Sequence, residues 1–207
     1  MATRQNIAPP NLVVAPKQYE QRYQDQLNNV QRLFYASVAN RINSPIPYGQ
    51  FTTSGPDLTN AGLTSVNLVP FSVTSGAFNT KIGNVPSRLY VAETGVYNVQ
   101  FSAQCGLSSA GNNRVVYFWL RQNGKDISDS AGKITVSNST PMMAAWNWLV
   151  TLQEGDYIEL AWSCTDDIHL ILLHEVAQTA APARPGLPAV ILTITWVSPY
   201  NTSVGIS

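Results

Sequence analysis

The sequence carries little charge: 12% of its 207 residues are charged, about half the usual share for a soluble domain. Its 12 basic and 12 acidic residues cancel, so no excess charge would draw the chain to nucleic acid or to an anionic membrane. Aromatic residues make up 10%, more than a disordered chain is expected to carry. We therefore expect a folded protein whose neutral surface is largely covered by other protein.

Long apolar runs are also missing. None approaches the roughly 20 residues that a membrane-spanning helix needs, and the N-terminus lacks the basic-then-apolar order of a secretion signal. We therefore expect neither membrane insertion nor export. Only two cysteines occur, Cys105 and Cys164. In a reducing cytosol they are expected to be buried free thiols, although a disulfide stays open if their strands end close together.

Catalytic motifs are absent from the sequence. It contains no Gly-x-Ser-x-Gly nucleophile elbow, no glycine-rich phosphate loop and no zinc-ligand spacing. Glu154, Asp156 and Glu159 could be imagined as a glycosidase pair, but Glu154 and Asp156 flank Gly155, which is typical of a solvated turn. We expect no catalytic residue, no cofactor and no metal, and the chain is predicted not to be an enzyme.

Two groups of residues could still be considered as metal ligands. His169 and His174 are expected five residues apart on one strand, hence on opposite faces, where they cannot chelate one ion. Packing in a core or an interface is the preferred interpretation for both histidines. Asp166 and Asp167 precede that strand, and there a plain turn is preferred over a calcium site.

Residues 18–43 are predicted to form the only helix, a stem with one apolar stripe. Apolar residues eleven positions apart match 3.67 residues per turn, the period of a nearly straight or slightly right-handed helical bundle. Pro45 ends the helix because a proline disfavours helical backbone in the residue before it. The stripe must lie on another surface; self-association about an axis is preferred, and the β domain of the same chain is the alternative. The stem residues assigned to self-association are Tyr23, Leu27, Val30, Phe34 and Val38.

Segments without a core of their own flank this helix. Residues 1–17 contain prolines that favour extended backbone, so we expect an arm anchored to another subunit or protein through Leu12, Val13 and Val14. Folding back onto its own domain is the alternative. Residues 44–63, rich in Ser, Thr, Gly and Pro, are predicted to be a linker.

Residues 64–198 are predicted to form one all-β domain, followed by a tail at 199–207. Strand patterns alternate there with turn residues, and such a succession without helices favours a two-sheet sandwich of jelly-roll type. The expected strands are 65–73, 87–93, 96–105, 114–122, 133–136, 142–153, 157–164, 168–175 and 189–197.

Three of these strands, 114–122, 168–175 and 189–197, are apolar on both faces. A two-layer sandwich has one interior, and leaving even five such side chains in water would forgo on the order of 1.5–3 kcal/mol each. Another subunit is the preferred cover, and the helix or arm of the same chain is the alternative. The residues assigned to this subunit interface are Tyr117, Trp119, Ile171, Leu173 and Ile191.

Several segments of the β region occur in a recognisable order. They are Gly95-Val96-Tyr97-Asn98-Val99, the run from Tyr117 to Gly124, Trp146-Asn147, the run from Glu154 to Ser163, and the run from Arg184 to Thr193. In this order and spacing they resemble the C1q/TNF-like jelly rolls, especially those of bacteriophage structural proteins. Residues 18–43 resemble the helical stem that precedes such domains in phage fibres.

The resemblance implies a TNF/C1q-like jelly-roll sandwich preceded by an arm and one amphipathic helix. It also implies a parallel homotrimer in a virion, assembled in the host cytoplasm, with capsid, neck or tail proteins as partners. A neck or head fibre is favoured because the chain is too short for a long tail fibre. The collagen-like stalk and signal peptide of secreted C1q domains are missing, which counts against an immune or hormone role.

A homotrimeric fibre or decoration protein with a mechanical role is therefore the preferred hypothesis. The alternative is a binding module of a tail fibre or spike, which recognises a host surface receptor, either a glycan or a protein. Trp146 and Trp148 share one face of a strand and could form a glycan site. Packing against the opposite sheet is the preferred interpretation for both tryptophans.

Overall fold

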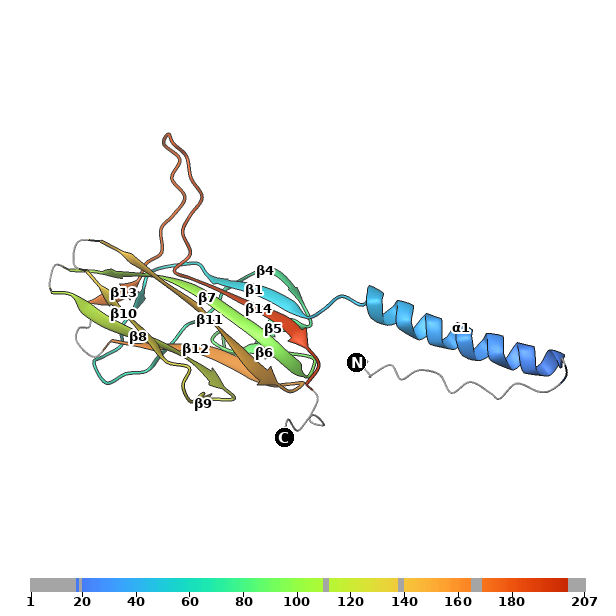
Figure 1. Ribbon diagram of the computed structural model, residues 1–207. Coiled ribbons are helices and arrows are strands. Elements are labelled where there is room, and N and C mark those ends of the chain that lie inside the picture. Colours follow the sequence, from blue (N-terminus) through green and yellow to red (C-terminus); the bar gives the residue numbers. More distant parts are fainter. Residues whose placement is uncertain (1–17, 19, 110–111, 138–139, 165–168, 201–207) are drawn as a thin grey trace. The chain divides into compact units, whose positions relative to one another are not determined.

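A computed structural model describes residues 18, 20–109, 112–137, 140–164 and 169–200. The chain divides into two compact units, Met1–Pro45 and Ile46–Ser207. Among the described residues, the first unit contains one helix and the second a β sandwich (Figure 1).

The helix α1 spans Gln21–Asn43, close to the predicted range of 18–43. It ends where Ser44 turns extended before Pro45, as the restriction on residues before proline requires. Along the stripe, all five residues assigned to self-association are half-buried, whereas Leu33 and Tyr35 on its flank are exposed. Within the described residues no helix combines the length and apolarity needed to cross a membrane. The predicted anchor residues of the arm, Leu12, Val13 and Val14, lie outside the described residues.

Over its described residues the β unit consists of two antiparallel sheets of seven strands each. Sheet A contains β1 (Tyr48–Thr53), β2 (Leu58–Thr59), β4 (Val73–Phe78), β7 (Gly95–Leu107), β11 (Met142–Leu152), β13 (Leu170–Leu172) and β14 (Val190–Ser198). Sheet B contains β3 (Asn67–Leu68), β5 (Thr80–Ile82), β6 (Leu89–Val91), β8 (Arg114–Gln122), β9 (Lys125–Asp126), β10 (Gly132–Val136) and β12 (Tyr157–Ser163). The chain passes back and forth between the sheets: β6, β8 and β12 lie in sheet B, and β7, β11 and β14 lie in sheet A. This crossing confirms the all-β jelly-roll class.

The two sheets pack face to face over one core. Alternation over 96–105 and 157–164 predicts one dry and one wet face for each of these strands. Strand β7 confirms the prediction, whereas on β12 the outward residues Glu159 and Ala161 are buried as well. The inward side chains of both strands are almost fully buried. These inward residues are Tyr97, Val99, Phe101, Ala103 and Cys105 on β7, and Ile158, Leu160 and Trp162 on β12. Strand β7 is central to sheet A, since β11 pairs along one of its edges and β14 and β13 along the other.

The predicted linker at 44–63 is wrong, because the β unit begins at Ile46 and this segment contains β1 and β2. Strand β1 has the Gly, Gln and Thr residues typical of a loop, yet Phe51 and Thr53 are buried. Gly49 is needed there, because a Cβ at this position would lie 2.6 Å from the Phe51 ring. The strands β4, β5 and β9 were also missed, and the expected strands 65–73, 87–93 and 168–175 are shorter in the structure.

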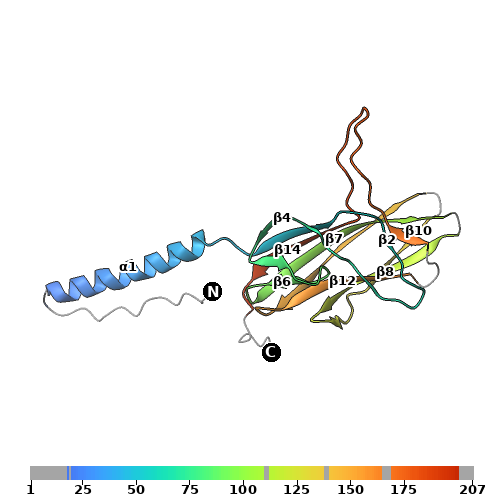
Figure 2. The same ribbon diagram turned by 180° about the vertical axis from the view of Figure 1, so that it is seen from behind.

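A hairpin connects β13 to β14 and leaves the sandwich. Backbone hydrogen bonds pair Glu175 with Leu187 and Gln178 with Arg184. Both views show residues 174–188 as a narrow two-legged projection (Figure 2). The two charged side chains on its legs, Glu175 and Arg184, form an ion pair with each other.

Candidate functional site

Sheet A has an outer face without charge. The strand registers place its outward residues in transverse rows across β11, β7, β14, β1 and β4. These rows are Ala145, Ser102, Ile191, Thr52 and Val73; Asn147, Gln100, Thr193, Gln50 and Gly76; and Leu149, Asn98, Thr195, Tyr48 and Phe78. We call this surface the neutral face.

The neutral face mixes exposed apolar groups with amides and hydroxyls. Leu149 is 67% exposed and Tyr48 is 46% exposed, and Asn147 donates a side-chain hydrogen bond to Asn98 at 3.2 Å. None of the seven described strands of sheet A contains Asp, Glu, Lys or Arg. Charge depletion combined with exposed apolar side chains is the composition of a protein interface core rather than of an ordinary solvated surface.

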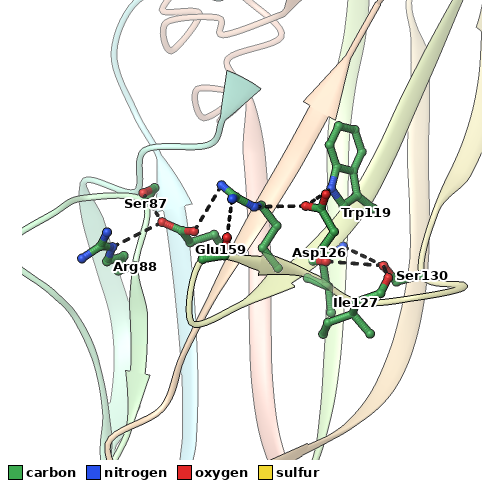
Figure 3. A network of polar contacts seen from close by, with 10 residues as sticks. Ser87, Arg88, Trp119, Asp126, Ile127, Ser130 and Glu159 are labelled. Atoms are coloured by element: carbon green, nitrogen blue, oxygen red, sulfur yellow. Dashed lines mark hydrogen bonds and ion pairs between the residues drawn. The ribbon is translucent and has the colours of Figure 1, made fainter. Parts of the chain in front are cut away.

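The strands of sheet B contain charged residues, and Arg121, Asp126 and Glu159 form a network on the outer face of this sheet (Figure 3). Its centre is Glu159 on β12, whose side chain is only 2% exposed. Ser87 Oγ donates to Glu159 Oε1 at 3.1 Å and Arg88 Nε donates to the same oxygen at 3.4 Å. Arg121 Nη1 lies 3.7 Å from Glu159 Oε2. The buried carboxylate is therefore compensated by two guanidinium groups and a hydroxyl.

The same network continues to the β8–β9 hairpin. Arg121 Nε lies 3.1 Å from Asp126 Oδ1, an ion pair whose N–H is not aimed at the oxygen. Trp119 Nε1–H donates to that oxygen at 2.8 Å (Figure 3). Arg88 lies over the Tyr157 ring, 4.6 Å from its centroid, and its contacts with Tyr90, Tyr157 and Glu159 raise its pKa although burial opposes this.

A hollow of about 330 Å³ opens beside this network. Its walls are two aromatic rings of β8, two carboxylates and the residues between them. The lining residues used below are Tyr117, Trp119, Asp126, Asp129 and Ser163. We call it the sheet B hollow.

The residues predicted for the subunit interface do not form one surface. Tyr117 and Trp119 lie on the outer face of sheet B, while Ile171, Leu173 and Ile191 belong to sheet A. Ile171 is 5% exposed within a single chain, so its own protomer already covers it. Leu173 also packs against its own chain, because its Cδ1 fills the space that a Cβ on Gly106 would take. A strand that is apolar on both faces indicates a second apolar face, but this pattern does not show to which of the two sheets the face belongs.

Trp146 and Trp148 pack into the core, as preferred from the sequence. The Phe101 ring stacks on Trp148 with centroids 5.3 Å apart and meets Trp146 edge-on at 4.7 Å. Gly132 makes room for Trp146, because a Cβ there would lie 2.6 Å from the indole. These two tryptophans therefore do not provide a glycan platform.

Both cysteines are free and buried, as predicted. Burial raises the pKa of the Cys105 thiol to about 12. The histidines are not on one strand, because β13 spans only Leu170–Leu172; His169 Nδ1 lies 3.4 Å from Ser108 Oγ, and the His174 backbone N–H donates to Asp57. Asp166 and Asp167 lie outside the described residues.

The carboxylates considered for catalysis have structural partners. Asp156 accepts hydrogen bonds from Gln122 and Asn123 at 2.9 and 2.7 Å and from the Gln153 backbone N–H at 2.8 Å. Partial burial acts to raise the pKa of Asp156, but these hydrogen bonds outweigh it and lower the pKa. Across the described ranges, no three His, Cys, Asp or Glu side chains gather as a metal site would need.

The sequence matches no model of a known protein family, and no curated protein matches it. Among solved structures, the globular domain of zebrafish complement 1qA protein is similar to this chain, with 11% sequence identity and a TM-score of 0.46. The match covers 74% of this chain and 99% of that domain.

Proposed function

We propose that this chain is a non-enzymatic structural protein of a bacteriophage virion, a homotrimeric fibre or knob attached by its N-terminus to the capsid, neck or tail. The observation that carries the assembly role is the neutral face, a sheet surface without charge and with exposed Leu149 and Tyr48. The sequence resemblance to phage jelly rolls supports the virion role and the number of three subunits.

Physical chemistry favours an interface on the neutral face. An apolar side chain removed from water contributes about 25 cal/mol per Å² of its buried surface. Burying the face against another copy would place no charge in a low-dielectric contact, so the desolvation cost of ion pairs is avoided. The amide and hydroxyl groups of Asn98, Gln100 and Thr193 can exchange hydrogen bonds with water for hydrogen bonds across the contact.

The helix offers a second self-association element. Its stripe of Tyr23, Leu27, Val30, Phe34 and Val38 is half-buried, and the adjoining Leu33 and Tyr35 are exposed. An amphipathic helix of this kind gains stability by burying its apolar stripe against other helices. Three parallel copies around an axis would provide that burial.

Sedimentation equilibrium of the full chain tests the assembly. We expect a mass of three times 22.6 kDa, and a clean monomer at micromolar concentration would contradict the proposal. Antibody labelling of purified phage particles is the companion test of the virion role, and unlabelled particles would contradict that part.

A matched pair of lysine substitutions locates the interface. Thr195→Lys adds a charge in the row of the neutral face that contains Leu149 and Tyr48, and Thr135→Lys adds one at an exposed position of β10 in sheet B. We expect Thr195→Lys to weaken assembly at least about tenfold, because like charges would meet in a desolvated contact. Thr135→Lys should assemble like the wild type; equal behaviour of the two variants would remove the neutral face from the interface.

The stem is tested in the same way. Phe34→Asp places a carboxylate within the apolar stripe, and Ala36→Asp places one at an exposed position on the other side of the helix. Phe34→Asp is expected to weaken trimer formation while the β unit stays folded by circular dichroism, and Ala36→Asp is the control. Normal assembly of Phe34→Asp would show that the helix is not an association element.

A further inference from the structure

The sheet B hollow has features that the assembly role does not use. Tyr117 and Trp119 are two residues apart on β8, so their side chains project on the same side of the strand about 7 Å apart. Ala161 lies opposite Trp119 and Ser163 lies opposite Tyr117 on the neighbouring strand β12. The small side chains on β12 leave the two aromatic rings as the prominent groups of this wall.

The Asp126 carboxylate of the hollow is held in place before any ligand arrives. Asp126 Oδ1 receives the Trp119 indole N–H at 2.8 Å and lies 3.1 Å from Arg121 Nε. Its side chain is nevertheless 65% exposed, and among the described residues only Oδ1 is engaged. The second oxygen is therefore available as a hydrogen-bond acceptor in a fixed orientation.

The loop that carries Asp129 is also fixed. Ser130 is buried, its Oγ donates to Ile127 O at 2.8 Å (Figure 3), and its carbonyl accepts the Trp148 indole N–H at 2.8 Å. Asp129 itself is exposed with a φ of 60°, a left-handed conformation that Asp tolerates better than most residues. A binding group on a loop clamped in this way loses little entropy when a ligand binds.

The charges around the hollow balance. Asp126, Asp129 and the adjacent Glu159 are matched by Arg88 and Arg121, which pair with Glu159 and Asp126, and by Lys133, which lies opposite Tyr117 on β10. A balanced site gives no net attraction to an anion or to an organic cation. Two aromatic rings beside fixed acceptors and a hydroxyl suit a neutral ligand with an apolar face and hydroxyl groups at its edges.

We infer that the sheet B hollow is a carbohydrate-binding site for a neutral hexose or the terminal unit of a neutral glycan. The Tyr117 and Trp119 rings contact the C–H face of the sugar, and Asp126 and Asp129 accept hydrogen bonds from its hydroxyls. This inference goes beyond the assembly role proposed above and is independent of it, because every lining residue comes from one chain.

Saturation-transfer NMR on the full chain tests the inference with a panel of neutral sugars: glucose, galactose, mannose, N-acetylglucosamine and their disaccharides. We expect binding of at least one sugar with a Kd of about 1 mM. Tyr117→Ala is expected to weaken it about tenfold through loss of the stacking surface. Asp129→Asn, which suits the same backbone conformation, should weaken it about threefold.

Two substitutions outside the hollow are matched controls. Tyr35→Ala removes an exposed aromatic ring from the helix, and Glu154→Gln neutralises an exposed carboxylate in a turn. Both should bind sugar like the wild type. The inference would be overturned if the folded chain bound no sugar at 20 mM, which is about 20 times the expected Kd. Sugar binding by Tyr117→Ala that equals the wild type, or binding of tetramethylammonium in place of sugars, would overturn it as well. Sedimentation equilibrium of the same samples measures the oligomeric state independently of sugar binding.

Discussion

The two sheets of the sandwich share an interior but differ on their outer faces. Inward side chains of β7 and β12 are equally buried, whereas charged residues occur in the described strands of sheet B and not in those of sheet A. The interior determines the fold, and either outer composition is compatible with it. We attribute the difference to the two proposals made above, contact of sheet A with another copy of the chain and binding of a sugar at sheet B.

The sheets also differ in how they accommodate an ionisable group out of water. Sheet A buries the Cys105 thiol among apolar neighbours, where the neutral form is favoured. Sheet B buries the Glu159 carboxylate and surrounds it with Ser87, Arg88 and Arg121. The free energy of unfolding should therefore depend on alkaline pH through the Cys105 thiol. It should depend on substitution of a network residue through the Glu159 carboxylate.

The largest expected effect concerns Cys105 at alkaline pH. Its pKa of about 12 in the folded chain lies above the ordinary value of 9.0. Below pH 9 the thiol is protonated in both states and its contribution is complete. Between pH 9 and 12 the unfolded chain loses this proton first, so the free energy of unfolding should fall by about 1.4 kcal/mol per pH unit.

Urea unfolding of the wild type and of Cys105→Ala between pH 8 and 11 measures this effect. The variant removes only the thiol's contribution, since the other titrating groups are common to both proteins. The difference between the two curves is the quantity of interest. Parallel curves would show that Cys105 is not desolvated and would erase this contrast between the sheets.

Sequence patterns predict the interior of this molecule better than its outer faces. Alternation over 96–105 and 157–164 identified the inward residues of β7 and β12, because a period of two directly reflects which residues share one side of a sheet. The strand β1 escaped notice, since Gly49 and Thr53 are small or polar and their burial depends on contacts with distant residues such as Pro70, whose carbonyl accepts from Thr53 Oγ1.

The outer faces depend on which strands become neighbours, and local patterns do not contain that information. Tyr117 and Ile191 look alike as outward apolar residues, yet they lie on different sheets. Glu159 was interpreted as a residue of a polar strand face, but Ser87 and Arg88 come from a segment about seventy residues earlier and bury it. The sheet B hollow likewise combines β8 with the loop after β9 and with β12.

A smaller effect is expected from Glu159→Ala. The variant leaves the Ser87 hydroxyl and two guanidinium groups without their central acceptor, which should lower the free energy of unfolding by about 2 kcal/mol at pH 7. Arg88 and Arg121 remain partly exposed, and hydration limits the loss. Glu154→Ala, in the exposed turn before β12, is the control and should change stability by less than about 0.5 kcal/mol. Equal stability of both variants in urea unfolding would show that the network does not stabilise sheet B.

The smallest effect on the free energy of unfolding is expected for Asp156, which lies in the turn before β12 at one end of sheet B. Asp156 binds the side chains of Gln122 and Asn123 and so connects the turn before β12 to the end of β8. Because hydrogen bonds lower its pKa in the folded chain, its contribution is complete at neutral pH and is lost as the pH falls through that lowered pKa. Asp156→Asn should therefore lower the free energy of unfolding by about 1 kcal/mol at pH 7, and the difference from the wild type should shrink below pH 4.

Asp129→Asn, the same substitution at an exposed site, is the control, and its free energy of unfolding should follow that of the wild type at every pH. A cost of Asp156→Asn that persists unchanged at pH 2 would mean that shape, rather than the charge of the carboxylate, holds this end of sheet B together.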